Sequence, residues 1–305
     1  MNTSAFGVEK GTNVRVPSTA NLMVDSADRF AYTTTSPWDF SITKKQNLIN
    51  GYFTRIGVTE VVLDWGYPNV SSYAGPTQSG NNIYKVTEIS GVTLTPAQTV
   101  TLPDNNYTVE EVLDTLVSLL NAVNWAGAGA PAPAPVFSVG TVNGQTGLLC
   151  TRTFKFLSSN NSIDSVLGCG LQSGVAINLM IVRPTADLRP YVYIDFVCDQ
   201  LTAVQDVKDT STQQVTRDVL TRWYFDEDTQ EGYDGYGFPI FMGYKPFRRR
   251  RIFNPPKQIK WEQNFNVGNL KFSVYDNIGN LLPYSAANGQ TIANNWRMTL
   301  QLSEV

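Results

Sequence analysis

Apolar and polar residues alternate along much of the chain, which predicts extended strands rather than helices. The pattern is clearest in the stretch 257–275, where two alternating segments are separated by Asn266-Val267-Gly268-Asn269. We therefore predict a β-hairpin with one apolar face. A two-stranded hairpin is marginal in water, so other strands must cover that face. The apolar positions are Ile259, Trp261, Phe265, Leu270, Phe272 and Val274.

The same period of two predicts half-buried strands elsewhere in both halves of the chain. In the stretch 52–65 the parity of the apolar positions changes near Thr59-Glu60. One extra residue there would bring both sets of apolar side chains to the same side, so we predict a β-bulge or a strand break. The other predicted strands contain Trp38, Phe40 and Ile42; Val192, Ile194, Phe196 and Cys198; and Met298, Leu300 and Leu302.

The middle of the chain carries the one strong helix signal. Thr108 and Glu111 have the spacing of a capping box, and we expect Asn105 or Asn106 to cap the helix. Its apolar stripe is more typical of core contact than of a partner site. The stripe consists of Val109, Leu113, Leu116, Val117 and Leu120.

Strands flank this helix on both sides. We predict strands at 83–89 and 92–102 before it, and at 136–142 and 148–157 after it. The second pair is joined at Asn143-Gly144, a strong hairpin-turn signal. The alanine- and proline-rich stretch 126–135 is predicted to be a flexible or extended tether.

These elements predict an all-β protein, namely a single jelly-roll β-sandwich with a small inserted α+β subdomain. Residues 21–85 and 179–305 are expected to form the jelly roll, and residues 86–178 the insert. Residues 1–20 are polar and without period. They are expected to be an N-terminal arm, either frayed or ordered on a neighbouring subunit.

Composition narrows the functional classes. Charged residues make up 16% of the 305-residue chain, against about 25% in typical soluble domains, and the net charge is -3. The chain therefore has no general attraction to nucleic acid or anionic membranes. Three cysteines suit buried thiols in a reducing compartment. The start of the chain lacks the apolar core of a signal peptide, and the longest apolar run, 175–182, is too short to span a bilayer.

Candidate chemistry is sparse. The chain has no histidine, which removes the usual general base and the commonest metal ligand. We therefore predict no enzyme activity, no catalytic residues, no cofactor and no metal site. An acidic stretch contains Asp226, Glu227 and Asp228, followed by Glu231 and Asp234. Its spacing lacks the glycine and final glutamate of a calcium-binding EF-hand, which favours a solvated loop.

Four consecutive arginines form the one dense basic cluster. Alternation in a strand would send two of them to each face. Three readings remain open for the cluster: an exposed loop, pairing with the acidic loop of the same or an adjacent subunit, and contact with nucleic acid. The candidate subunit-contact residues are Arg248, Arg249, Arg250, Arg251, Asp226, Glu227 and Asp228.

Four segments of the chain, taken together, resemble the penton-type minor capsid proteins of virophages and polinton-like viruses. They lie in both flanks and in the predicted insert. The segments are Asn21-Leu-Met-Val-Asp-Ser-Ala-Asp-Arg29, Ser36-Pro-Trp-Asp-Phe-Ser-Ile42, Thr101-Leu-Pro-Asp-Asn-Asn-Tyr-Thr-Val-Glu-Glu-Val-Leu113 and Leu270-Lys-Phe-Ser-Val-Tyr-Asp-Asn-Ile-Gly-Asn-Leu281.

The resemblance implies a jelly roll that stands upright in the shell of a dsDNA virus. It implies a homopentamer at the icosahedral five-fold vertices, beside trimers of a double-jelly-roll major capsid protein. An insertion between strands, which 86–178 suits, would project outward and contact minor cement proteins or a host receptor. The protein would be synthesised in the host cytoplasm and located in the virion. The alanine- and proline-rich stretch 126–135 matches no pattern of the family.

Two other functional readings remain open from the sequence. One is a jelly-roll minor capsid or spike-base protein placed away from the five-fold axis. The other is a carbohydrate- or receptor-binding β-sandwich on a cell or particle surface, which the many tyrosines and tryptophans favour and the absence of a secretion signal disfavours.

Overall fold

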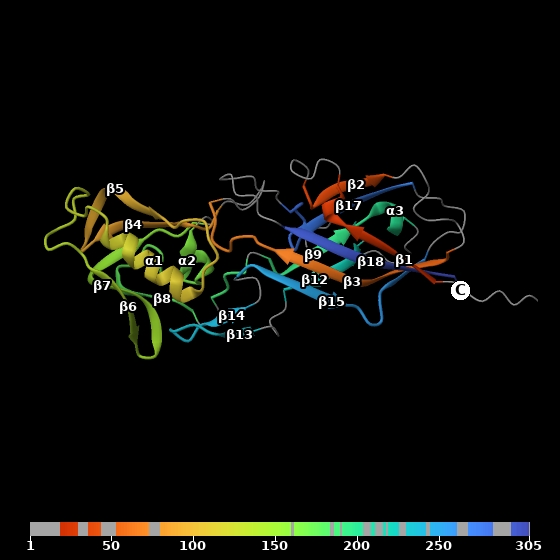
Figure 1. Ribbon diagram of the computed structural model, residues 1–305. Helices are drawn as coiled ribbons and strands as arrows, with labels where there is room; N and C mark the ends of the chain where they lie inside the picture. Colours follow the sequence, from red (N-terminus) through yellow and green to blue (C-terminus); the bar gives the residue numbers. More distant parts are fainter. Residues whose placement is uncertain are drawn as a thin grey trace, which may run out of the picture.

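The chain forms two lobes (Figure 1). The two flanks of the sequence together form one lobe, and the middle section forms the other. The flanks are called the roll below, and the middle section is called the insert. The computed structural model describes residues 19–29, 36–43, 53–72, 80–159, 162–183, 186–189, 191–203, 209–210, 216–217, 219–225, 230–241, 245–260, 268–282 and 294–304.

The roll contains two antiparallel sheets of four principal strands. The β3 sheet has the order β1-β18-β3-β15, and the β9 sheet has the order β12-β9-β17-β2. Successive principal strands change sheet at every step except from β9 to β12, which is the winding of a jelly roll. The predicted fold class is therefore confirmed. The strands are β1 (Thr19–Asp25), β2 (Asp39–Thr43), β3 (Arg55–Trp65), β9 (Tyr193–Val197), β12 (Val219–Tyr224), β15 (Phe247–Ile252), β17 (Asn269–Asp276) and β18 (Asn295–Ser303).

The core of the roll lies between the two sheets and is rich in aromatic side chains. Trp296 of the β3 sheet is buried among aromatic rings of the β9 sheet. Its ring centroid lies 5.1 Å from that of Phe196 and 5.5 Å from those of Phe40 and Phe272. Its indole Nε1 donates a hydrogen bond to the carbonyl of Pro37 at 2.8 Å. The inward-facing positions of both sheets thus interdigitate in one apolar layer.

The predicted irregularity in β3 is a β-bulge. Thr299 of β18 stands opposite Glu60, while the next residue, Leu300, stands opposite Val58, so Thr59 has no register partner on β18. The Thr59 hydroxyl donates to the Thr299 carbonyl at 3.2 Å. Because of the extra residue, the apolar side chains before and after the bulge face the same core.

The prediction of a hairpin at 257–275 is wrong. Its first segment, β16 (Gln258–Lys260), pairs with β3, and its second, β17, pairs with β2 and β9 in the other sheet. Ile259, Leu270, Phe272 and Val274 are all buried, as the alternation predicted, whereas Trp261 and Phe265 lie outside the described residues. A period of two determines which face a residue occupies, but it does not determine the partner strand. Val192 also differs from its prediction, because it precedes β9 and is half exposed.

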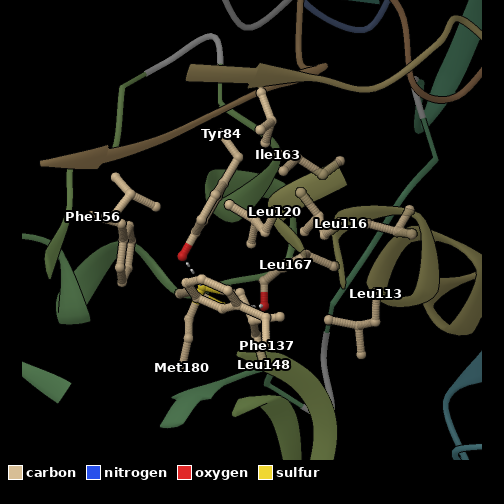
Figure 2. Packing of buried hydrophobic residues seen from close by; sticks show 14 of the residues in the cluster. Tyr84, Leu113, Leu116, Leu120, Phe137, Leu148, Phe156, Ile163, Leu167 and Met180 are labelled. Carbon is tan, nitrogen blue, oxygen red and sulfur yellow. Dashed lines mark hydrogen bonds between the residues drawn. The ribbon is translucent and has the colours of Figure 1, made fainter. Parts of the chain in front are cut away.

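The insert is a curved antiparallel sheet of order β5-β4-β7-β6, with β8 also paired to β7. Helix α1 packs against β5, β6 and β7. Figure 2 shows the resulting core, in which the Tyr84 hydroxyl donates to the sulfur of Met180 at 3.3 Å. The elements are β4 (Ile83–Ile89), β5 (Val92–Thr101), α1 (Val109–Asn121), β6 (Phe137–Val142), β7 (Gln145–Phe156), α2 (Ile163–Val166), η2 (Gly170–Gln172) and β8 (Ile177–Ile181).

Helix α1 begins with the capping box that its sequence predicts. The amide of Glu111 donates to the Thr108 hydroxyl at 3.2 Å, and the amide of Thr108 donates to the Glu111 carboxylate at 2.7 Å. The capping residue is therefore Thr108 rather than Asn105 or Asn106. The predicted stripe is buried except for Val117, which is only partly covered.

The hairpin turn at Asn143-Gly144 is also confirmed. Both residues have positive φ, 54° and 75°, and Val142 stands opposite Gln145. A two-residue turn of this kind needs the left-handed region at both positions, which asparagine and glycine tolerate best.

The prediction of a flexible tether at 126–135 is wrong for its first half. The amides of Ala128 and Ala130 donate to the carbonyl of Trp125, at 3.2 and 3.0 Å. Ala128 is buried in the insert core, and the indole of Trp125 is held by the Leu120 carbonyl at 2.9 Å. A segment of glycine and alanine has only small side chains, so its backbone can pack closely against a core. Such a composition therefore does not require a flexible segment.

Two short helical elements and two short hairpins complete the described structure. Strands β10 and β11 pair with each other, as do β13 and β14. Of the predicted N-terminal arm, residues 1–18 lie outside the described residues, and Thr19 and Ala20 belong to β1. No helix in the described part of the chain has the length and apolar character needed to span a membrane. The elements are η1 (Ser26–Asp28), α3 (Asp199–Thr202), β10 (Asp209–Thr210), β11 (Thr216–Arg217), β13 (Gln230–Tyr233) and β14 (Pro239–Phe241).

Candidate assembly surface

The four arginines of the basic cluster lie on β15, an edge strand of the β3 sheet. Arg248 and Arg250 face outward, and their side chains are 62% and 60% exposed. Arg248 Nε lies 3.2 Å from Asp64 Oδ1, and Arg250 Nη2 lies 2.6 Å from Glu60 Oε2. Each of these arginines is thus paired with an acidic residue of the neighbouring strand β3.

The other two arginines lie on the opposite face of β15. Arg249 forms an ion pair with Glu231 of β13. The guanidinium carbon of Arg251 lies 5.9 Å from the ring centroid of Trp223 and 6.0 Å from that of Phe253. These two side chains run along the edge of the apolar layer and place their charges at its rim. The predicted division of two arginines to each face is therefore confirmed.

For the acidic part of the candidate contact cluster, the structure gives no position. Asp226, Glu227 and Asp228 lie outside the described residues. Glu231 contacts the arginine strand, whereas Asp234 contacts α1 of the insert. In the ranges that the structure describes, no three His, Cys, Asp or Glu side chains are grouped so as to hold a metal ion.

The outer face of the β3 sheet exposes positive charge and two aliphatic side chains. A third ion pair, Arg297 with Asp25 at 2.6 Å, joins β18 to β1 in the same way that Arg248 and Arg250 join β15 to β3. In all three pairs the arginine is more exposed than the carboxylate. Met23, Thr299, Glu60 and Ile252 form one row across the four strands, and its two ends, Met23 and Ile252, are 78% and 63% exposed.

The outer face of the β9 sheet is different, because it contains an arginine held between tyrosines. Arg222 makes two hydrogen bonds to Asp195, of 2.6 and 2.9 Å, and its guanidinium lies 3.9 Å from the ring centroid of Tyr193. Asp195 is only 4% exposed. Its hydrogen bond raises the pKa of Arg222 above the usual value, although partial burial opposes this effect. Tyr224, next to Tyr193, is 41% exposed.

Sequence reasoning did not find this tyrosine and arginine cluster. The alternation had placed Tyr193 and Asp195 on the outer face of their strand. Their partner strand was unknown, so the pairing of Asp195 with Arg222 could not be seen. The signal was the matching spacing of Tyr193-Ile194-Asp195 and Arg222-Trp223-Tyr224.

The cysteine thiols are not arranged for nucleophilic chemistry. All three are free and buried. Burial raises the pKa of Cys169 and of Cys198 to about 12, and it raises the pKa of Cys150 as well. Because the thiolate is the reactive form, these side chains are inert at neutral pH.

Comparison with known proteins gives a likeness of fold. No family model matches the sequence, and no curated protein matches it. Among solved structures, the penton protein of mavirus superposes with a TM-score of 0.51 at 12% identity, covering 95% of this chain and 100% of the other. A chain from the cryo-EM structure of the Sputnik virophage has a TM-score of 0.49 at 11% identity, with 94% and 98% covered. The fold of the mavirus protein thus extends over nearly the whole chain, the insert included.

Proposed function

We propose that this chain is a structural capsid protein that forms the homopentameric penton at the five-fold vertices of a virophage-like or polinton-like dsDNA virus. The observation that carries the proposal is the jelly roll interrupted between its third and fourth principal strands, in a chain whose fold superposes on a viral penton protein over 95% of this chain and all of the other. The site contributes shape and side chains for contact rather than reactive groups.

A five-membered ring requires two different surfaces on each subunit. In a closed ring with cyclic symmetry, one patch of each copy meets a different patch of the next. The two sheets of the roll offer such a pair, because the β3 sheet exposes Arg248 and Arg250 and the β9 sheet exposes Tyr224. Arginine and tyrosine are enriched in protein interfaces, which supports the use of these faces.

The arginine strand enters this proposal as a subunit contact. Arg248 and Arg250 project from the edge of the roll and keep most of their surface exposed after pairing with β3. Exposed ion pairs of this kind add little to the stability of a monomer, so these arginines can exchange their partners on β3 for those of an adjacent copy at little cost. We propose that they contact the acidic segment Asp226, Glu227 and Asp228 of the adjacent copy.

The proposed division of the chain keeps the expected parts: residues 21–85 and 179–305 form the roll, 86–178 the insert and 1–20 the arm. Whole strands move its boundaries by a few residues, because β1 begins at Thr19 and the insert sheet runs from Ile83 of β4 to Ile181 of β8. Two separate clusters of buried side chains support the division: one joins the sheets of the roll, and the other joins α1 to the sheet of the insert. The proposed partners are further copies of this chain and the major capsid protein, with cement proteins or a receptor contacting the insert. The proposed site of assembly is the host cytoplasm.

Sedimentation velocity of the purified full chain tests the proposal. We expect a concentration-dependent species of five times the 33.8 kDa chain mass. The double variant Arg248→Ala, Arg250→Ala should weaken it, and the matched control Lys155→Ala, which removes a charge on the insert, should not. A chain that stays monomeric at every concentration, both alone and with the major capsid protein, and that binds a glycan array, would favour a carbohydrate-binding protein instead.

A further inference from the structure

The β13–β14 hairpin, residues 230–241, comes from the roll half of the sequence but packs on the insert. In Figure 1 it extends from the roll toward the lobe that contains α1. Phe238, at 6% exposed, belongs to the buried cluster of the insert. Tyr236, Ile240 and Phe241 pack against the same cluster. The sequence places this hairpin more than a hundred residues after α1, so the contact is a tertiary one.

Polar contacts between the hairpin turn and α1 are reciprocal. The amide of Glu110 donates to Asp234 Oδ2 at 2.9 Å, and the amide of Gly235 donates to Glu110 Oε2 at 2.6 Å. The amides of the first helical turn lack partners within the helix, so Asp234 satisfies one of them and lies at the favourable end of the helix dipole. A Cβ atom at Gly235 would lie 2.6 Å from Glu110 Oε1, so the turn lies directly against the end of the Glu110 side chain.

Hydrogen bonds within the turn also hold the Asp234 side chain in place. Asp234 Oδ1 accepts hydrogen bonds from the amides of Tyr236 and Phe238, at 3.0 and 2.8 Å, which leaves Oδ2 for α1. The Tyr236 hydroxyl then donates to Asp114 at 2.8 Å, one helical turn beyond Glu110. Two positions on one face of α1 thus hold two positions of the turn.

The other end of the hairpin is fixed to the roll. Glu231 forms an ion pair with Arg249 of the edge strand β15. Arg189, in the segment that returns from the insert to the roll, lies 4.7 Å from the ring centroid of Phe241 and donates to the carbonyl of Phe225 at 2.9 Å. Phe225 itself is buried in the roll core. The hairpin therefore contacts both lobes through different residues.

We infer that this hairpin is a strut that holds the insert at one orientation relative to the roll. Apart from this hairpin, the described chain passes between the two lobes twice, before β4 and after β8. Two crossings at one end of the insert permit rotation about the line between them, whereas a third contact on α1 prevents it. A partner that binds the insert would then meet it at a fixed position, whatever the oligomeric state of the roll.

The test measures the distance between the lobes in the full-length protein. Ser41→Cys on β2 and Ser138→Cys on β6 place spin labels at exposed positions, and the native thiols are buried. Labelled protein is diluted with unlabelled chain, so that only distances within one copy are measured by double electron-electron resonance. The strut variant combines Asp234→Ala, Gly235→Ala and Tyr236→Phe. Glu88→Gln, which removes an ion pair within the insert, is the matched control.

The parent and the control should give one narrow distance distribution, and the strut variant should lose it while its circular dichroism is unchanged. The amide of Glu110 should also lose its protection from hydrogen exchange. If the triple variant does not fold, Asp234→Ala alone, which removes the acceptor for the Glu110 amide, gives the same comparison. A folded variant that keeps the narrow distribution would overturn the inference. The result is independent of ring formation, which sedimentation of the same samples reports.

Discussion

The roll and the insert differ in how far apart along the chain their paired strands lie. In the roll, β1 pairs with β18, so that Leu22 stands opposite Leu300. In the insert, β4 pairs with the next strand β5, and β6 pairs with the next strand β7. Closing long loops costs more conformational entropy before any contact is gained. The insert is therefore determined mainly by neighbouring strands, with Phe238 of the later hairpin added to its core, whereas the roll needs both ends of the chain.

From this difference we expect each lobe to unfold without the other. Their buried side chains form two separate clusters, and the cluster of the roll is the richer in aromatic rings. Substitutions in one cluster should leave the hydrogen bonds of the other intact. The predictions below test this from the largest expected effect to the smallest.

Trp296→Ala should have the largest effect, because it removes the ring at the centre of the roll core. We expect a loss of about 3 to 5 kcal/mol of unfolding free energy in the roll, as for other large aromatic truncations. Hydrogen exchange followed by mass spectrometry should show β17 and β18 losing protection in mild urea while β4 and β7 keep it. The exposed Tyr224→Ala is the control. Simultaneous loss in both lobes would contradict separate stability.

Leu116→Ala should give the reverse pattern. Leu116 is fully buried on the inner side of α1. Its truncation should cost about 2 to 5 kcal/mol, confined to the insert. The neighbouring Val117→Ala, at a partly covered position, should cost clearly less. The same hydrogen-exchange experiment tests whether the destabilisation is confined to the insert. Loss of protection in β18 would contradict this expectation.

Thr108→Ala should have a smaller effect on the insert, about 1 kcal/mol, because it removes the side-chain acceptor for the Glu111 amide. Thr115→Ala is a matched control, since its hydroxyl only donates to a carbonyl within the same exposed helix face. Thermal unfolding followed by the helical circular dichroism signal measures the loss of stability in both variants. Equal effects of the two variants would show that the cap is not a determinant.

The smallest effect concerns the proposed strut and appears only at alkaline pH. The hydrogen bond to Asp114, with smaller contributions from burial and nearby carboxylates, raises the pKa of Tyr236 from 10.0 to about 12. The folded state therefore holds this proton more tightly than the unfolded chain. The resulting stabilisation is complete below pH 10 and is lost as the pH rises toward 12.

Ultraviolet titration of tyrosinate measures this pKa, with Tyr236→Phe identifying the signal. Asp114→Asn should lower the pKa of Tyr236 toward its usual value. An unchanged titration in Asp114→Asn would show that the two side chains are not in contact in solution.

Features set by neighbouring residues could be predicted from the sequence. The turn at Asn143-Gly144, the capping box of Thr108 and Glu111 and the bulge at Thr59 each depend on a few adjacent side chains and backbone angles. The burial of alternating apolar residues was equally accessible, since a half-covered sheet requires it.

Features that depend on distant partners could not be predicted. The alternation at 257–275 fits one hairpin and two strands in separate sheets equally well, and only the winding of the roll decides between them. Asp234 looked like part of a solvated acidic loop, because its partner, the first turn of α1, lies far away in the sequence. The pairing of Asp195 with Arg222 likewise needed the register of β9 against β12. The role of Asp226, Glu227 and Asp228 stays a prediction.

Negative-stain images of the purified full-length chain test the central claim most directly. Class averages should show a closed ring of five subunits, each with a second lobe set at the same angle to the ring. The contact variant Arg248→Ala, Arg250→Ala should give fewer rings. Separate two-lobed particles under all conditions, or rings with two-fold or three-fold symmetry, would contradict a penton built from this jelly roll.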